Sequence, residues 1–204
     1  MSNPEHVEIF KQGVEVWNRW RNEHRAIMPD LSGEDFSGAQ LDDVRLSFAD
    51  LRGTRFHAAQ LQRAYFVSSN LSEADFSQAQ LIEGHLDSAR IMNANFCQAN
   101  LQRAKVRQAK LYAANLNGAD LRHANLSRAG LSSARLDGAD FSPPYWIGTS
   151  WSMWILARPE DLKPPSIKVH PMSGSAPWYA RSPTSLWHFW RAQAKALQQS
   201  QHYV

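Results

Sequence analysis

A large apolar residue occupies every fifth position of this chain from residue 31 to residue 141. All 23 positions hold Leu, Phe, Ile or Val, and Ala stands two residues before them 17 times in 22. An α-helix turns by about 500° in five residues, which would spread these side chains around its axis. A straight strand fails as well, because an odd period sends successive side chains to opposite faces. The pattern therefore excludes a long regular helix or strand here.

A chain that turns once in every five residues satisfies the pattern, because each large side chain can then point inward beside a small Ala. Four such sides close a coil of 20 residues, and the coils stack about 4.8 Å apart through backbone hydrogen bonds. Residues 20 apart in sequence should then be neighbours. This arrangement predicts an internal ladder of four rings, Phe36, Phe56, Phe76 and Phe96. Outside, it predicts an amide row, Gln40, Gln60, Gln80 and Asn100, and a row of alternating charges, Asp43, Arg63, Glu83 and Arg103.

Within each repeat, Ala is followed by Asp or Asn, then by Leu or Phe, and then by two variable residues. Examples are Ala74-Asp75-Phe76, Ala94-Asn95-Phe96 and Ala119-Asp120-Leu121. Over roughly residues 30–145 this pattern resembles the pentapeptide-repeat family. The resemblance implies an all-β solenoid, a right-handed quadrilateral β-helix of about six coils. It implies little about function, because the family is named for its scaffold.

Composition divides the chain into three parts. Eight of the ten prolines and six of the eight tryptophans follow residue 142, and the other two tryptophans precede residue 30. We therefore expect an N-terminal capping helix in residues 1–29, the pentapeptide-repeat β-helix in 30–145 and a Trp/Pro-rich segment in 146–204. Caps are expected because a stack of coils ends in two open edges that invite aggregation.

The two flanking segments each have a predicted helix. The first covers residues 4–25, with Asn3 as its N-cap and Val7, Phe10, Val14 and Trp17 on its apolar side. The second lies near residues 183–199, within the irregular and helical C-terminal segment. That segment is interpreted as a cap on the last coil, and the alternative is a partner-binding element, because tryptophan is enriched in binding hot spots.

Residues that carry chemistry are sparse. The single Cys97 excludes a disulfide framework, and the eight histidines have no metal-ligand spacing. The sequence has no glycine-rich phosphate loop, and the repeat fills its own interior. We therefore expect no enzyme, no cofactor, no metal and no small-molecule substrate. The N-terminal residues lack a secretory signal pattern, so a cytoplasmic protein of bacterial type is expected.

These features predict a non-enzymatic scaffold or adaptor for protein–protein interactions, whose partner is a protein of unknown identity or a second copy of the chain. Nucleic acid and a membrane surface are not favoured as partners. The alternative is a DNA-mimicking, gyrase-binding protein that protects against quinolones or toxins. Such mimicry needs a negative surface, whereas residues 31–145 hold 12 acidic and 12 basic residues. The candidate partner-binding residues are Trp178, Trp187, Trp190, Tyr65, Val67, Tyr112, Arg103, Lys105, Arg107 and Lys110.

Overall fold

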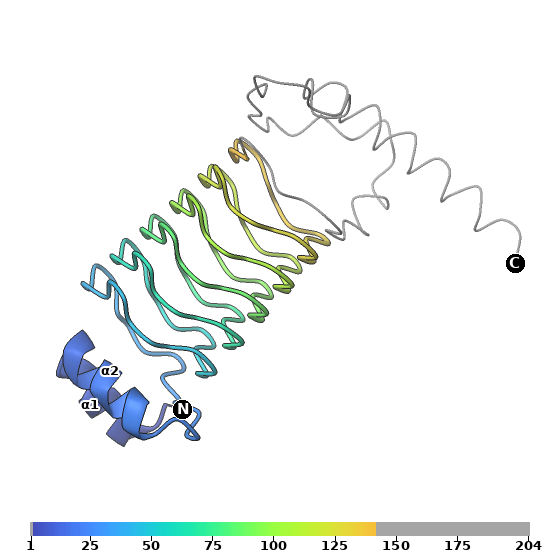
Figure 1. The fold of residues 1–204 in the computed structure, drawn as a ribbon. Coiled ribbons are helices and arrows are strands. Elements are labelled where there is room, and N and C mark those ends of the chain that lie inside the picture. Colours follow the sequence, from blue (N-terminus) through green and yellow to red (C-terminus); the bar gives the residue numbers. More distant parts are fainter. Residues whose placement is uncertain (1, 142–204) are drawn as a thin grey trace, which may run out of the picture.

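The computed structural model describes residues 2–141, which begin with two short helices. Helix α1 spans Pro4–Lys11 and helix α2 spans Val14–Glu23 (Figure 1). Asn3 caps α1 as predicted, because its side chain accepts a hydrogen bond from the Glu5 backbone N–H. The prediction of one continuous helix over residues 4–25 is wrong. Gly13 has a φ of 103°, a conformation that favours glycine, and it ends the first helix and serves as the N-cap of the second.

Residues 30–141 form a solenoid whose repeating unit is 20 residues. At every fifth position, a parallel β-bridge joins a residue to the residue 20 positions later. The first bridge joins Asp30 to Asp50, and the last joins Asp120 to Asp140. Each side of a coil consumes only five residues, so the bridges stay isolated and no longer strand forms within the described residues. The predicted stacking of neighbours 20 apart is confirmed. Figure 1 shows the coils stacked one on another as a rod.

The large residues of the five-residue register point into this rod and fill it. Every one of the 23 is buried, and so are nearly all of the alanines that stand two residues before them. The predicted phenylalanine ladder is confirmed. Phe56 and Phe76 stack with their ring centroids 4.9 Å apart, and Phe76 and Phe96 stack at 4.8 Å. The interior is thus occupied by the repeat itself, so binding chemistry must lie on the outside.

Each corner of a coil is a tight turn that contains a left-handed residue. The side centred on Leu46 is typical: the Ala49 N–H donates to the Leu46 carbonyl at 3.2 Å, and Phe48 between them has a φ of 61°. Seventeen residues other than glycine share this left-handed conformation at equivalent positions. Such a φ is costly for any residue with a Cβ, and the hydrogen-bonded ladder between coils offsets that cost.

Helices α1 and α2 pack against the first coil (Figure 1). Val7, Phe10 and Trp17 are buried in one continuous core with the coil residues, and the Phe10 and Phe36 rings lie 4.6 Å apart. Side chains of α2 also bind the coil backbone. The Arg45 N–H donates to Asn18 Oδ1 at 2.8 Å, and Arg21 Nη2 donates to the Ser47 carbonyl at 3.2 Å.

Candidate interaction surface

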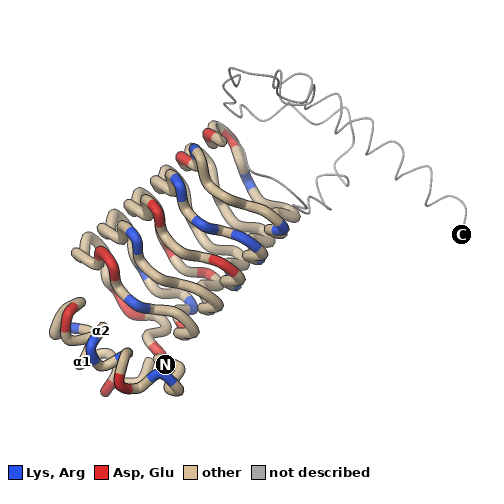
Figure 2. The backbone as a smooth tube through the Cα atoms, in the orientation of Figure 1, with Lys and Arg blue, Asp and Glu red and all other residues tan. Residues whose placement is uncertain are grey.

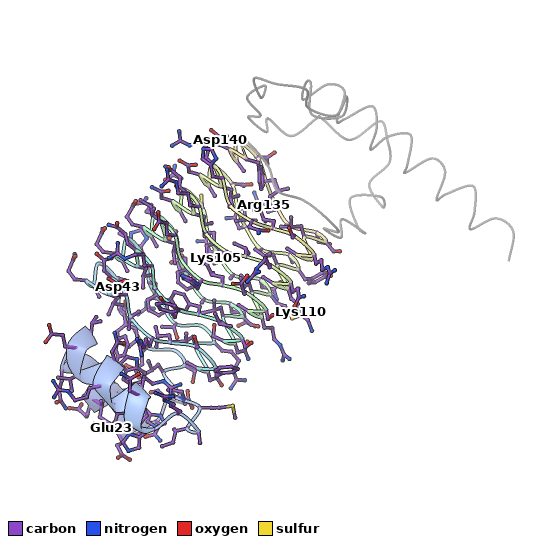
Figure 3. All side chains as sticks on the ribbon, viewed as in Figure 1. Glu23, Asp43, Lys105, Lys110, Arg135 and Asp140 are labelled. Carbon is purple, nitrogen blue, oxygen red and sulfur yellow. The ribbon has the colours of Figure 1, made fainter. Side chains whose placement is uncertain are left out.

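One of the four sides of the rod carries the exposed aromatic residues Phe48 and Tyr65 together with the basic residues Arg45, Lys105, Arg107 and Arg128. We call it the Tyr65 face; it is made of residues 45–48, 65–68, 85–88, 105–108 and 125–128. In each of these segments the first, third and fourth residues point outward, while the second is a buried member of the five-residue register. In Figure 3, Asp43 marks one corner of this face and Lys105 its body, whereas Lys110 lies on the next side of the coil, in the bridged row that runs from Asp30 to Gly130.

An aromatic pair lies at the centre of the Tyr65 face. The rings of Tyr65 and His85 stack with centroids 4.5 Å apart and an interplanar angle of 18°, because the two residues are bridged neighbours on successive coils. Lys105 is the next residue in the same row. Partial burial lowers the pKa of His85, and the positive charge of Lys105 lowers it further. The row therefore presents a neutral aromatic surface that ends in a cation.

Three arginines on this side each pair with a carboxylate one coil earlier. The pairs, with their N–O distances, are Arg63–Asp43 (2.6 Å), Arg103–Glu83 (3.4 Å) and Arg107–Asp87 (2.8 Å). The predicted alternation of charge along the row from Asp43 is confirmed. Hydrogen bonds within the pairs raise the pKa of Arg107 and lower that of Asp43, so both side chains stay charged.

Beside the aromatic pair lies an open hollow of about 270 Å³. It is lined by Arg63, Tyr65, Glu83, His85, Arg103 and Lys105. The hollow is shallow because it lies between rows of side chains on a rod whose interior is filled. It suits a side chain or short segment of a partner better than an enclosed substrate.

Three basic residues on the Tyr65 face and two on the adjoining side form no ion pair within the described part of the chain. The three on the face are Arg45, Lys105 and Arg128, and the two on the adjoining side are Arg90 and Lys110. Arg90 and Lys110 are bridged neighbours, so two exposed positive charges lie on adjacent coils. Figure 2 shows Lys and Arg, in blue, on successive later coils of the visible side.

Exposed apolar side chains also occur near the opposite end of the same face, which carries Arg45. Phe48 lies on the first coil and Met28 just before the solenoid begins, and their exposed fractions are 55% and 75%. Ile27 is also exposed, at 39%, whereas Val67 in the neighbouring row is half-buried. Large apolar side chains that solvent does not favour therefore gather beside the first two coils.

The structure brings together five of the ten residues predicted from sequence as partner-binding. Tyr65, Val67, Lys105 and Arg107 lie on the Tyr65 face, and Arg103 lies at one corner of it. Lys110 and Tyr112 do not join them: both are exposed on the adjoining side, where Tyr112 lies one coil after Met92. Trp178, Trp187, Trp190 and the helix near residues 183–199 lie outside the described residues, so their role stays a prediction.

The sequence analysis did not assign His85, Arg90 or Arg128 to one surface. The signal was available, because writing the chain in rows of 20 places His85 below Tyr65 and Arg90 above Lys110. Among residues 2–141, no group of three or more His, Cys, Asp or Glu side chains could hold a metal ion. Neither helix in that range is long and apolar enough to cross a membrane.

Comparison with solved structures finds proteins that are built from a similar repeat. HetL from the cyanobacterium Nostoc sp. PCC 7120 is 28% identical, with 61% of this chain and 69% of that chain covered and a TM-score of 0.38. A thylakoid-lumen protein of Arabidopsis thaliana is 31% identical, with coverages of 56% and 66% and a TM-score of 0.29. Rfr23 from Cyanothece 51142 is 23% identical, with coverages of 66% and 97% and a TM-score of 0.33. No curated protein matches the chain significantly.

The family comparison covers the whole solenoid. The model of pentapeptide repeats in eight copies matches residues 29–57, and the model of the pentapeptide repeat region matches residues 59–141. Together the matched residues make up more than half of the chain and coincide with the stacked coils. The three solved structures just described are also pentapeptide-repeat proteins. This chain therefore belongs to the pentapeptide-repeat family.

Proposed function

We propose that this protein is a non-enzymatic scaffold that binds another protein through the Tyr65 face. The observation that carries the proposal is the gathering of an aromatic stack, unpaired cations and exposed apolar side chains on one side of the rod. Solenoids commonly bind partners through such long regular faces. The filled interior supports the same conclusion, because it leaves no enclosed site for a substrate.

The charge of the rod does not favour the alternative of a DNA mimic that binds gyrase. Residues 90–128 hold seven basic residues and a single acidic one, Asp120. A mimic of duplex DNA needs a continuous negative surface, and these coils would repel a site built to bind phosphates.

We propose in addition that α1 and α2 are a cap for the first coil and that the coils wind in the right-handed sense implied by the family. In later coils, the N–H and carbonyl of Tyr65 bond to the neighbouring coils through Val44 and Leu46. The equivalent groups of Arg45 are bonded instead by Asn18 and Trp17. Side chains of α2 thus occupy the positions that a preceding coil would fill.

Photo-crosslinking in the native cell tests the binding face. A crosslinking amino acid replaces Ser88, on the Tyr65 face, or Gln78, on the opposite side; both residues are exposed and have a φ of 59°. We expect one discrete protein adduct from position 88 and none from position 78. Equal adducts from both positions, or none from either, would contradict the proposal. Protection of gyrase from a quinolone by the purified protein would favour the mimic instead.

A further inference from the structure

The Tyr65 face changes character along the rod, and this gradient limits what can bind it. An exposed apolar side chain, Phe48, lies at its beginning. The stacked Tyr65 and His85 follow, and Lys105 comes next in their row. At the far end Arg107 and Arg128 lie on the face, and Arg90 and Lys110 lie beside it on the adjoining side. Arg45 is a cation at the beginning of the face, but its Nη1 donates a hydrogen bond to Asn22 of α2. Apart from Arg45, the order along the axis is apolar, aromatic and then basic.

The basic end is not explained by the stability of the rod. Arg90 and Lys110 are neighbours on adjacent coils, and like charges directly opposite each other destabilise a ladder. Elsewhere the same protein places opposite charges at this separation, as in Arg55 with Asp35 at 2.8 Å. Like charges are also bridged at Asp30–Asp50 and Asp120–Asp140, but there Asp50 and Asp120 each pair with an arginine two residues later. Arg90 and Lys110 have no ion-pair partner among the described residues, and an acidic ligand would relieve their repulsion.

We propose, building on the scaffold function above, that the Tyr65 face binds an extended acidic segment of a partner protein that carries a large apolar residue at one end. The apolar residue contacts Phe48 and Tyr65, and the carboxylates pair with Lys105, Arg128 and the neighbouring Arg90–Lys110 pair at the start of the adjoining side. The chain's own residues 142–204 are a poor candidate for this occupant, because they hold six basic and only two acidic residues.

The geometry fixes the spacing within that segment. Tyr65 and Lys105 lie two coils apart, and Phe48 and Arg128 lie four coils apart. At about 4.8 Å per coil these separations are roughly 10 and 19 Å, whereas an extended chain rises about 3.3 Å per residue. The apolar residue and the acidic residues should accordingly be separated by about three to six positions.

Carboxylates on the same face distinguish a peptide from nucleic acid. Asp43, Glu83 and Asp87 stand among the basic residues, where they pair with arginines. A phosphate backbone has uniform negative charge along its length and would meet each of them. A short peptide can place its acidic residues only at the basic end, and its apolar residue meets the aromatic and apolar surface.

Selection from a random peptide library on the full-length protein tests this inference. We expect peptides of about 12 residues, long enough to span the face, to be enriched in Asp and Glu together with one Phe, Leu, Ile or Trp three to six positions away. Binding of a selected peptide should weaken about tenfold between roughly 50 and 300 mM NaCl, because its ion pairs are exposed to solvent. Enrichment without acidic residues would overturn the proposal.

Variants locate the site. The pair Arg90→Ala and Lys110→Ala should weaken binding of the selected peptide about tenfold, since two charge-assisted contacts are lost. The matched pair Arg55→Ala and Arg135→Ala removes two exposed arginines from the opposite side and should leave binding unchanged. Equal effects of the two pairs, or tighter binding of a single-stranded DNA of about 20 nucleotides than of any peptide, would refute the proposal.

The crosslinking result separates this inference from the proposed function. A protein adduct at position 88 combined with peptides that lack acidic residues would leave the scaffold function standing and remove the acidic ligand. If no adduct formed at position 88 but acidic peptides still bound to the Tyr65 face, the proposed scaffold function would be refuted. The inference that this face binds acidic segments would stand.

Discussion

The indole Nε1–H of Trp17 donates a hydrogen bond of 2.8 Å to the backbone carbonyl of Arg45. In the coils that follow, the carbonyl at this position accepts from a backbone N–H of the previous coil, as Tyr65 does from Leu46. A side chain of helix α2 thus replaces a backbone donor at the edge of the solenoid. The same residue is fully buried against the first coil, so one tryptophan supplies both apolar area and a specific bond.

Replacement of Trp17 by phenylalanine should destabilise the protein by about 1–3 kcal/mol, because the Arg45 carbonyl would remain buried without its donor. The free energy of unfolding in urea measures this effect. Trp20→Phe is the control, because Trp20 is only partly buried and its indole donates no hydrogen bond within residues 2–141. Equal losses from the two substitutions would contradict a specific role for the Trp17 hydrogen bond.

Replacement by glycine should change the stability of the protein in opposite directions at two adjacent alanines. Ala58 has a left-handed φ of 54° and is partly exposed, so Ala58→Gly should stabilise the protein by about 0.5–1 kcal/mol. Ala59 is fully buried, and Ala59→Gly should destabilise it by about 1 kcal/mol through lost packing and added chain entropy.

Ala113 and Ala114 repeat this arrangement on another side of the rod, with a φ of 55° at Ala113. Thermal unfolding of the four single variants would test the rule twice. The same sign of change at both members of a pair would show that the left-handed conformation carries no cost here.

The loss of stability on replacing a phenylalanine of the ladder by leucine should depend on how many rings that phenylalanine contacts. Phe76 stacks on Phe56 at 4.9 Å and on Phe96 at 4.8 Å, whereas the next residue in the row after Phe96 is Leu116. Phe76 also makes an edge contact with Phe66. Phe76→Leu should therefore cost about 1–2 kcal/mol more than Phe96→Leu, since it removes three ring contacts instead of one. Chemical denaturation of both variants compares them directly, and an equal loss would count against ring stacking as a source of stability.

The pKa of Asp35 should respond to its neighbour Ser37. The Ser37 hydroxyl donates to the Asp35 carboxylate at 2.6 Å and, with Arg55, lowers the pKa of Asp35 to about 2 from its ordinary 3.8. Because the folded pKa is depressed, this carboxylate favours the folded state above pH 3.8, and that contribution is lost as the pH falls toward 2.

Titration of Asp35 by NMR would measure this pKa. Ser37→Ala should raise it, because the hydroxyl is the largest cause of the shift. Arg55→Gln should raise it by less. A pKa that does not move when Ser37 is replaced would exclude the hydroxyl bond as its cause.

The core of this fold could be predicted residue by residue because one rule places each side chain. A large apolar residue at every fifth position has only one inward orientation in a coil of 20, so the ladder of Phe56 and Phe76 followed from counting alone. The break between α1 and α2 could not be derived in the same way. Val7, Phe10, Val14 and Trp17 fit one helical stripe, and the positive φ of Gly13 depends on how α2 packs against the first coil.

The Tyr65 face was only partly predictable. Exposure of Tyr65 followed from its place in the repeat, but the stacking on His85 and the shallow hollow beside it depend on side-chain rotamers. The four basic residues 103, 105, 107 and 110 also looked alike in the sequence. In the structure Arg103 and Arg107 pair with carboxylates, whereas Lys105 and Lys110 form no ion pair within the described residues.

The two periods of the solenoid impose different limits on insertion and deletion. Loss of a single residue within the coils would move every later large side chain out of the interior. Gain of five residues would keep the interior intact and rotate every later exposed residue onto the next side, which would divide the Tyr65 face between two sides of the rod. Only a duplication of 20 residues, one whole coil, lengthens the rod and keeps each exposed residue on its own side. The rod can therefore grow or shrink without loss of its surface pattern only by whole coils.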